Sequence, residues 1–94
     1  MFLFILTYTK NLSEVDMYVS AHREFIDHFY TEGKFICSGA QVPRTGGIIL
    51  CKTSSITEAG SIRNQDPFVI NGVADYQIIE FNATKHAKGF EIFI

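Results

Sequence analysis

Residues 2–8 form an almost continuous apolar segment, and both alternating sets of its positions are largely hydrophobic. One set is Phe2, Phe4, Leu6 and Tyr8, and the other is Leu3, Ile5 and Thr7. A strand that is apolar on both faces is typical of the centre of a sheet that is covered on both sides. The pattern therefore predicts a central, doubly covered β-strand.

Residues 13–33 carry apolar side chains every three or four positions, which is the spacing of an amphipathic α-helix. Ser13 and Asp16 have the spacing of a capping box, with Asp in place of the usual Glu, and Gly33 is a typical helix stop. The inward stripe is Val15, Tyr18, His22, Phe25 or Ile26, and Phe29. We expect one helix with His22 on its apolar face.

Two further strand patterns follow, at residues 35–42 and 47–53. The Pro and Gly content of residues 43–46 suits a turn, so the pattern predicts a β-hairpin. Ser55 and Glu58 then form a capping box, which predicts the start of a short second helix.

The second helix is expected to end before Asp66, because the proline at position 67 disfavours helical geometry in the preceding residue. Asp66 should therefore adopt an extended or turn conformation, with Phe68 as the first large apolar anchor of the next segment. Residues 73–81 have the pattern of a final strand, and residues 90–94 form an apolar tail.

The predicted order of strand, helix, strand, strand, helix, strand is the split βαβ arrangement of a ferredoxin-like α+β fold, in one domain over residues 1–94. Both helices would cover one face of an antiparallel sheet and leave the other face bare. That face would be apolar, because either Ile78 or Ile79 must point to it. We expect a homodimer, or a larger assembly, in which two sheets pack face to face and residues 85–94 pack on the neighbour.

Composition and charge narrow the choice of partners. The chain has 94 residues and a net charge of −2, with no basic patch beside aromatic residues, so we expect no nucleic-acid partner. No apolar segment approaches the roughly 18 residues of a membrane span. Residues 1–8 lack the basic start and cleavage site of a signal peptide, so we expect a cytoplasmic protein without a membrane partner.

The sequence supplies neither a four-ligand Cys and His set for zinc nor a Gly-rich loop for phosphate, so we expect no metal, nucleotide or other cofactor. Cys37 and Cys51 would lie opposite each other if the hairpin turned at Arg44, which would allow a cross-strand disulfide. The favoured interpretation is free buried thiols, which are typical of a reducing compartment.

His22 and Asp66 are the candidate catalytic pair. A partly desolvated imidazole beside a carboxylate has a fixed tautomer and makes a general base or acid near neutral pH. The simpler interpretation of His22 is a histidine at the edge of the core that bonds a backbone carbonyl. The simpler interpretation of Asp66 is an Asx turn that ends a helix.

Ser38, Gly39, Pro67 and Phe68 are the candidate substrate-binding residues. Ser38 could orient a substrate oxygen, or it could be an ordinary strand residue beside a bulge at Gly39. Phe68 would close the pocket. Three tyrosines have spacings that suit either the pocket or, as is more usual for aromatic residues, the core (Tyr8, Tyr18, Tyr76). We expect His28 and His86 to be solvated.

An ordered set of short motifs along nearly the whole chain resembles the YciI-like family. These are Ala21-His22, Glu32-Gly33-Lys34, Ser38-Gly39, Gly46-Gly47, Ser55-x-x-Glu58-Ala59, Asp66-Pro67-Phe68 and Gly72. The resemblance implies a dimeric α+β barrel of two ferredoxin-like subunits, with a His and Asp dyad onto which His22 and Asp66 map. Val19 stands where members often have a basic residue, and Gly39-Ala40 stands where they often have Gly-Pro.

The resemblance also implies cofactor-independent proton transfer on a small cyclic or aromatic compound, of the lyase, dehydrohalogenase or isomerase type. Two alternatives stay open. One is a dimeric protein that binds a small ligand without turning it over, and the absence of a basic residue at Val19 favours it modestly. The other is a structural dimer module in which the His22 and Asp66 side chains lie apart.

Overall fold

The computed structural model describes residues 1–94 and contains a four-stranded antiparallel sheet in the order β2-β3-β1-β4. The strands are β1 (Phe2–Tyr8), β2 (Phe35–Ala40), β3 (Gly46–Cys51) and β4 (Ala74–Glu80). This order is that of the predicted ferredoxin-like fold, which is confirmed. β1 pairs with both β3 and β4, so the most apolar segment of the chain is a central strand, as its pattern predicts.

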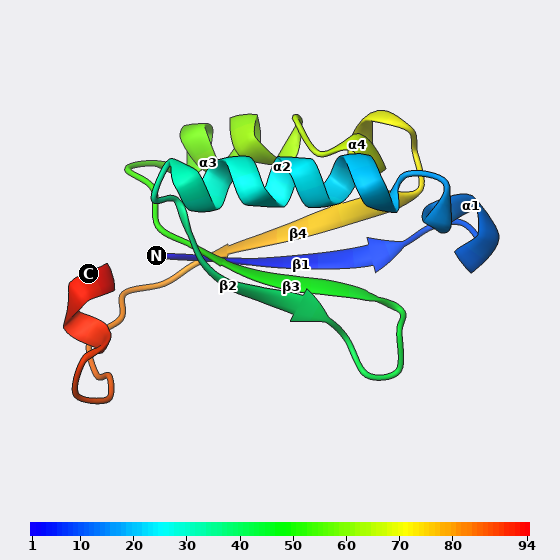
Figure 1. Cartoon of the computed structure of the whole chain (residues 1–94). Helices are drawn as coiled ribbons and strands as arrows, with labels where there is room; N and C mark the ends of the chain where they lie inside the picture. Colours follow the sequence, from blue (N-terminus) through cyan, green and yellow to red (C-terminus); the bar gives the residue numbers. More distant parts are fainter.

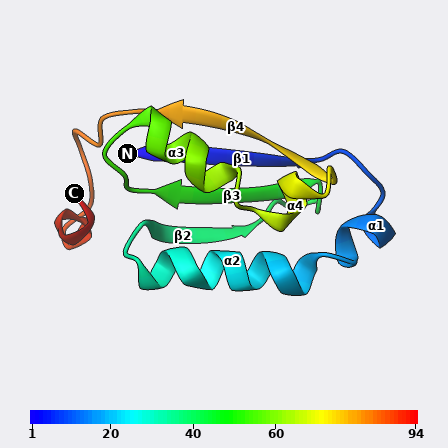
Figure 2. The ribbon, with the colours of Figure 1, turned by 90° about the horizontal axis from the view of Figure 1, so that it is seen from above.

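The helices α2 (Val19–Thr31), α3 (Ile56–Arg63) and α4 (Pro67–Ile70) lie on one face of the sheet (Figure 1). The short helix α1 (Leu12–Asp16) lies beyond the end of β1, and a 3₁₀ helix, η1 (Phe90–Phe93), ends the chain. Seen from above, α2 runs along the β2 side of the sheet, and α3 and α4 lie over its other side (Figure 2). No helix is long and apolar enough to cross a membrane.

The single helix predicted over residues 13–33 is wrong, because the chain forms α1 and α2 with a break between them. The Asn11 side chain caps α1 by accepting a hydrogen bond from the backbone N–H of Glu14 at 3.0 Å, and Ser13 only donates to that same oxygen. The first helix then closes with tight turns, and Tyr18 leaves helical geometry at φ −115° and ψ 5°. Val15 is buried on α1, so the apolar stripe continues across the break. The sequence pattern therefore shows no interruption between the two helices.

The short helix α4 was not predicted from the sequence. Asp66 is extended, as expected, at φ −69° and ψ 123°, but it also caps α4, whose first residue is Pro67. Proline suits the first position of a helix because its missing N–H would have no partner there. The break that Pro67 makes in the chain is therefore also the start of the next helix.

The main core lies between the sheet and the helices. Its buried members are Phe2, Phe4, Leu6, Val15, Phe25, Phe29, Phe35, Ile49, Cys51, Ala59, Ile62, Phe68, Val73, Ala74 and Tyr76. The alternate strand positions face away from the helices. Leu3, Ile5, Ile48 and Leu50 are only half-buried there, and Ile79 is exposed. We call these five residues the bare face.

The two cysteines do not lie opposite each other. Phe35 pairs with Cys51 and Cys37 pairs with Leu50, because a bulge between Phe35 and Cys37 shifts the register. Both thiols are free, with Cys37 exposed on the side of the bare face and Cys51 in the core. The favoured interpretation of two free thiols is therefore confirmed, but only Cys51 is buried, and the condition for a cross-strand disulfide is not met. Burial raises the pKa of Cys51 to about 11, so this thiol stays protonated at neutral pH.

Candidate functional site

His22 lies in the first turns of α2 and points between the helix and the sheet. Its Nδ1 is 2.8 Å from Oδ1 of Asp66, which belongs to the turn before α4. The imidazole stacks on the Phe68 ring, with centroids 4.0 Å apart and planes 9° apart. Only 17% of the His22 side chain is exposed. Residues 44 positions apart in the sequence therefore form one tightly packed pair.

Asp66 has no exposed surface, yet both of its carboxylate oxygens have partners. Oδ1 accepts the backbone N–H of Phe68 at 2.9 Å as well as facing His22. Oδ2 accepts a hydrogen bond from the hydroxyl of Tyr76. Asp66 is thus both the cap of α4 and the partner of His22, so its two interpretations from the sequence were not exclusive.

The surroundings of Asp66 fix the direction of the His22 hydrogen bond. Burial and the neighbouring Asp66 carboxylate raise the pKa of Tyr76 far above its usual value, so its hydroxyl keeps its proton and donates. The Phe68 N–H can only donate. Both groups donate to the Asp66 carboxylate, and carboxylate oxygens accept hydrogen bonds, so Nδ1 of His22 is the donor and carries the proton. Nε2 is then left as the basic nitrogen of the neutral ring.

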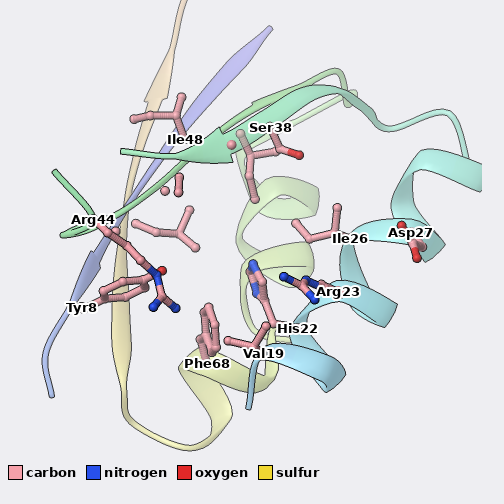
Figure 3. Close-up of a pocket in the computed structure, with 16 residues that line it drawn as sticks. Tyr8, Val19, His22, Arg23, Ile26, Asp27, Ser38, Arg44, Ile48 and Phe68 are labelled. Carbon is pink, nitrogen blue, oxygen red and sulfur yellow. The ribbon is translucent and has the colours of Figure 1, made fainter. Parts of the chain in front are cut away.

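A cavity of about 390 Å³ opens between α2 and the strands β2 and β3, and His22 and Phe68 lie on its wall (Figure 3). The other lining residues are Leu6, Tyr8, Val19, Arg23, Ile26, Asp27, Ser38, Gly39, Ala40, Arg44, Gly46, Gly47, Ile48 and Ile49. This volume suits a compact ligand. Asp66 lies behind His22 and does not line the cavity, and neither does Pro67.

Ser38 and Gly39 reach the cavity from β2. The Ser38 hydroxyl lies 2.8 Å from the Tyr30 hydroxyl of α2, so it already has a hydrogen-bond partner at the cavity edge. The bulge expected at Gly39 lies earlier, between Phe35 and Cys37. A closer approach occurs at Gly46, where a Cβ would lie 1.8 Å from the Leu6 carbonyl oxygen. Only glycine allows this contact between β3 and β1 at the cavity floor.

Arg44 is the cavity residue that sequence reasoning missed, because it lies in a segment that was interpreted only as a turn. Its Nη2 is 2.7 Å from Oδ1 of Asp16 on α1, and its guanidinium carbon is 5.6 Å from the centre of the Tyr8 ring. The hydrogen bond to Asp16 raises the pKa of Arg44 above its usual value. The signal that could have found it is a cation between two strands that border the same cavity.

Of the other tyrosines and histidines considered from the sequence, only Tyr8 lines the cavity. His28 is exposed on α2, and Nδ1 of His86 is 3.8 Å from Glu91 in the C-terminal segment. Of the tyrosines, Tyr8 lines the cavity, Tyr76 lies behind Asp66, and Tyr18 packs against the edge of the core.

Comparison with known protein families gives a match to the YCII-related domain over residues 1–82. The chain belongs to the YCII-related family. The family resemblance expected from the short motifs is therefore confirmed. Comparison with curated proteins gives no match.

A solved structure supports the fold of this YCII-related protein. It is 5-chloro-2-hydroxyhydroquinone dehydrochlorinase (TftG) from Burkholderia phenoliruptrix AC1100, in complex with 2,5-dihydroxybenzoquinone. The two chains share 20% sequence identity with a TM-score of 0.71, and the similarity covers 94% of this chain and 97% of that one. At this identity the likeness establishes the shared fold.

Proposed function

We propose that this YCII-related protein is a small enzyme that transfers protons on a compact cyclic or aromatic compound, without a cofactor. His22 is the general base or acid, and Asp66 orients it. The observation that carries the proposal is the placement of His22, with Nδ1 bonded to a fully buried carboxylate and the rest of the ring on a cavity wall. A histidine that only filled the core would not need both.

In this mechanism Nε2 of His22 accepts a proton from an acidic O–H or C–H group of the bound ring. Asp66 stabilises the imidazolium that forms and holds the ring in place, since Phe68 and Tyr76 keep the carboxylate fixed. The imidazolium then returns the proton to another atom of the substrate or to its leaving group. Lyase, dehydrohalogenase and isomerase reactions all contain such a step.

The substrate-binding roles proposed for Ser38, Gly39, Pro67 and Phe68 differ in character. Phe68 stacks on one face of His22 and supplies an apolar wall against which a flat ring can pack. Ser38 and Gly39 offer a hydroxyl and open backbone on the opposite wall. Pro67 acts indirectly, because it starts the helix that carries Phe68.

The test is turnover by wild type and His22→Gln. The first probe is 5-chloro-2-hydroxyhydroquinone, the compound named for the structural neighbour, followed by a panel of hydroxylated quinols and lactones, with chloride release and absorbance as readouts. We expect His22→Gln to lower kcat by about 10²–10⁴-fold. The control His28→Gln changes the same residue type on the same helix outside the cavity and should keep full activity. Wild-type turnover by His22→Gln would contradict the proposal.

The second candidate is a protein that binds a small ligand without turning it over. Val19, an apolar residue, lines the cavity where members often have a basic residue, which favours this candidate. A thermal-shift screen with the same panel separates the two. Stabilisation by compounds that show no turnover would support the binding protein.

We also propose a homodimer in which the bare faces of two copies pack together, with residues 85–94 on the neighbour. The bare face is apolar, and Ile92 and Ile94 of the tail are 76% and 53% exposed in one chain. Such surfaces are usually covered, and two-fold symmetry is the commonest way to do so.

Sedimentation of wild type and Leu50→Asp tests the dimer, because Leu50 lies on the bare face between Leu3 and Cys37. We expect the substitution to give monomers and to expose Cys37 to a thiol reagent that reacts slowly with the wild type. The control Met17→Asp changes an apolar residue at the C-terminal end of α1 that is 72% exposed and lies outside the bare face, so it should leave the dimer intact. A monomeric wild type, or a dimeric Leu50→Asp, would contradict the dimer.

A further inference from the structure

Two arginines line the cavity, but only one is held in place. Arg23 is exposed on α2 and makes no hydrogen bond or ion pair, and Asp27, four positions later, lines the same rim with the opposite charge. Arg44 instead is bonded to Asp16 at 2.7 Å and lies over the Tyr8 ring. A cation that is already ordered loses less entropy when it binds a ligand.

The bond to Asp16 leaves most of the Arg44 donors free. A guanidinium group has five N–H donors in a fixed plane, and Asp16 takes a bond from Nη2 alone. Asp16 does not line the cavity, so its bond to Arg44 lies outside the space that a ligand would occupy. Figure 3 shows Arg44 entering the cavity from the hairpin side, while the His22 ring comes from α2. The remaining donors can therefore meet a ligand that also reaches His22.

The cavity wall between these two groups is apolar and aromatic. Tyr8, beneath Arg44, and Phe68, beside His22, pack edge to face with ring centroids 5.9 Å apart. A flat ring can lie against them with one polar edge toward Arg44 and the other toward His22. A carboxylate or phenolate oxygen is the group that a planar guanidinium binds best.

We propose that Arg44 binds the anionic oxygen of the substrate, so that the cavity selects ring compounds bearing a carboxylate or phenolate. This deepens the proposed function and rests on it, because it assumes that the substrate occupies the cavity beside His22. Arg44 is then the residue that decides which edge of the ring faces His22. On α2, Val19 is uncharged and Arg23 is not held by an ion pair, so the ordered cation of the cavity is Arg44 from the β2–β3 hairpin.

Equilibrium binding of benzoate and its neutral isostere benzamide tests the proposal without turnover. We expect wild type to bind benzoate about tenfold more tightly, since a charge-assisted hydrogen bond has roughly this effect. Arg44→Gln should weaken benzoate binding about tenfold and change benzamide binding less than twofold. The control Arg63→Gln removes the same charge on α3, outside the cavity, and should change neither affinity. Amide NMR spectra verify that each variant is folded and show where the ligand binds.

Asp16→Asn separates anion binding from a structural role of the ion pair. If Arg44 only ties the hairpin to α1, Asp16→Asn should weaken benzoate binding as much as Arg44→Gln does, and that result would overturn the proposal. If Arg44 binds the anion, Asp16→Asn keeps the guanidinium and loses only its ordering by Asp16, so it should weaken benzoate binding less than Arg44→Gln does.

Equal affinity of wild type for benzoate and benzamide would also overturn the proposal, as would no benzoate binding at millimolar concentration. These outcomes are independent of the proton-transfer hypothesis. Loss of turnover in His22→Gln with no preference for the anion would support the catalytic role of His22 and reject that of Arg44. A preference for the anion without turnover would support the anion-binding role of Arg44 and reject the catalytic role of His22.

Discussion

Two acidic side chains make ion pairs at opposite ends of the molecule, and their lengths are almost the same. Asp66 lies 2.8 Å from His22, and Glu58 lies 2.9 Å from Lys34. Their surroundings differ, because the side chains of the first pair are 0% and 17% exposed and those of the second are 32% and 35% exposed. The length of an ion pair therefore does not separate the two pairs, whereas burial beside a cavity sets His22 and Asp66 apart as the candidate site.

The exposed pair has a structural role. Ser55 caps α3 by accepting the backbone N–H of Glu58 at 3.1 Å. The Glu58 carboxylate accepts the Ser54 hydroxyl at 2.7 Å, and its ion pair with Lys34 attaches α3 to the residue before β2. Water can replace each of these partners, so such pairs contribute little to stability. The buried pair has no such replacement, since water does not reach Asp66. Removing one member leaves the others without partners.

The largest effect expected from this difference is that of Asp66→Ala. The change leaves the Tyr76 hydroxyl and the Phe68 N–H without an acceptor and opens a void, so it should lower the free energy of unfolding by about 3–5 kcal/mol. Denaturant unfolding measures it, with Glu58→Ala as the matched change in the exposed pair. Glu58→Ala should cost far less, and equal losses would remove the distinction between the two pairs.

Tyr76→Phe should have the next largest effect. The substitution keeps the ring in the core but leaves Oδ2 of Asp66 without its donor, at an expected cost of about 1–3 kcal/mol. It should also lower turnover, because a less firmly held carboxylate orients His22 less well. Unfolding curves and kcat measure the two effects. An unchanged stability would mean that water or another group replaces the hydroxyl.

The smallest expected effect is the loss of stability at low pH when the Glu58 carboxylate is protonated. The side chains of Thr53, Lys34 and Ser54 lower the pKa of Glu58 from 4.5 to about 2, so its stabilising effect is complete above pH 4.5 and is lost as the pH falls toward 2. Comparing the unfolding of wild type and Glu58→Gln across this range measures the effect. The difference in stability should shrink as the pH falls. A difference that is independent of pH would show that the Glu58 charge contributes nothing.

Much of this organisation could be predicted from the sequence, because it depends on local signals. The continuous apolar segment over residues 2–8 and the capping box at Ser55 identified elements that the structure contains. The break after α1 was missed because Val15 is buried just before it, so the apolar stripe gave no sign of an interruption. α4 was missed because Pro67 was interpreted as a stop and not also as a start.

The candidate site was predicted in part for the same reason. The pairing of His22 and Asp66 followed from an apolar helix face and a helix break, supported by the family resemblance. Tyr76 and Arg44 could not be assigned, because their positions depend on strand register and on the course of the hairpin. Both contribute polar atoms to the site from elements whose patterns indicate only core or turn.

The most direct test of the central claim is ¹⁵N NMR of the histidine rings in wild type and Asp66→Ser. Serine keeps a cap for α4 but cannot reach His22 as the carboxylate does. We predict that neutral His22 carries its proton on Nδ1 in the wild type and shifts to the Nε2–H form that free histidine favours in Asp66→Ser, while His28 does not change. The same His22 tautomer in both proteins would contradict the account and leave Asp66 as a helix cap alone.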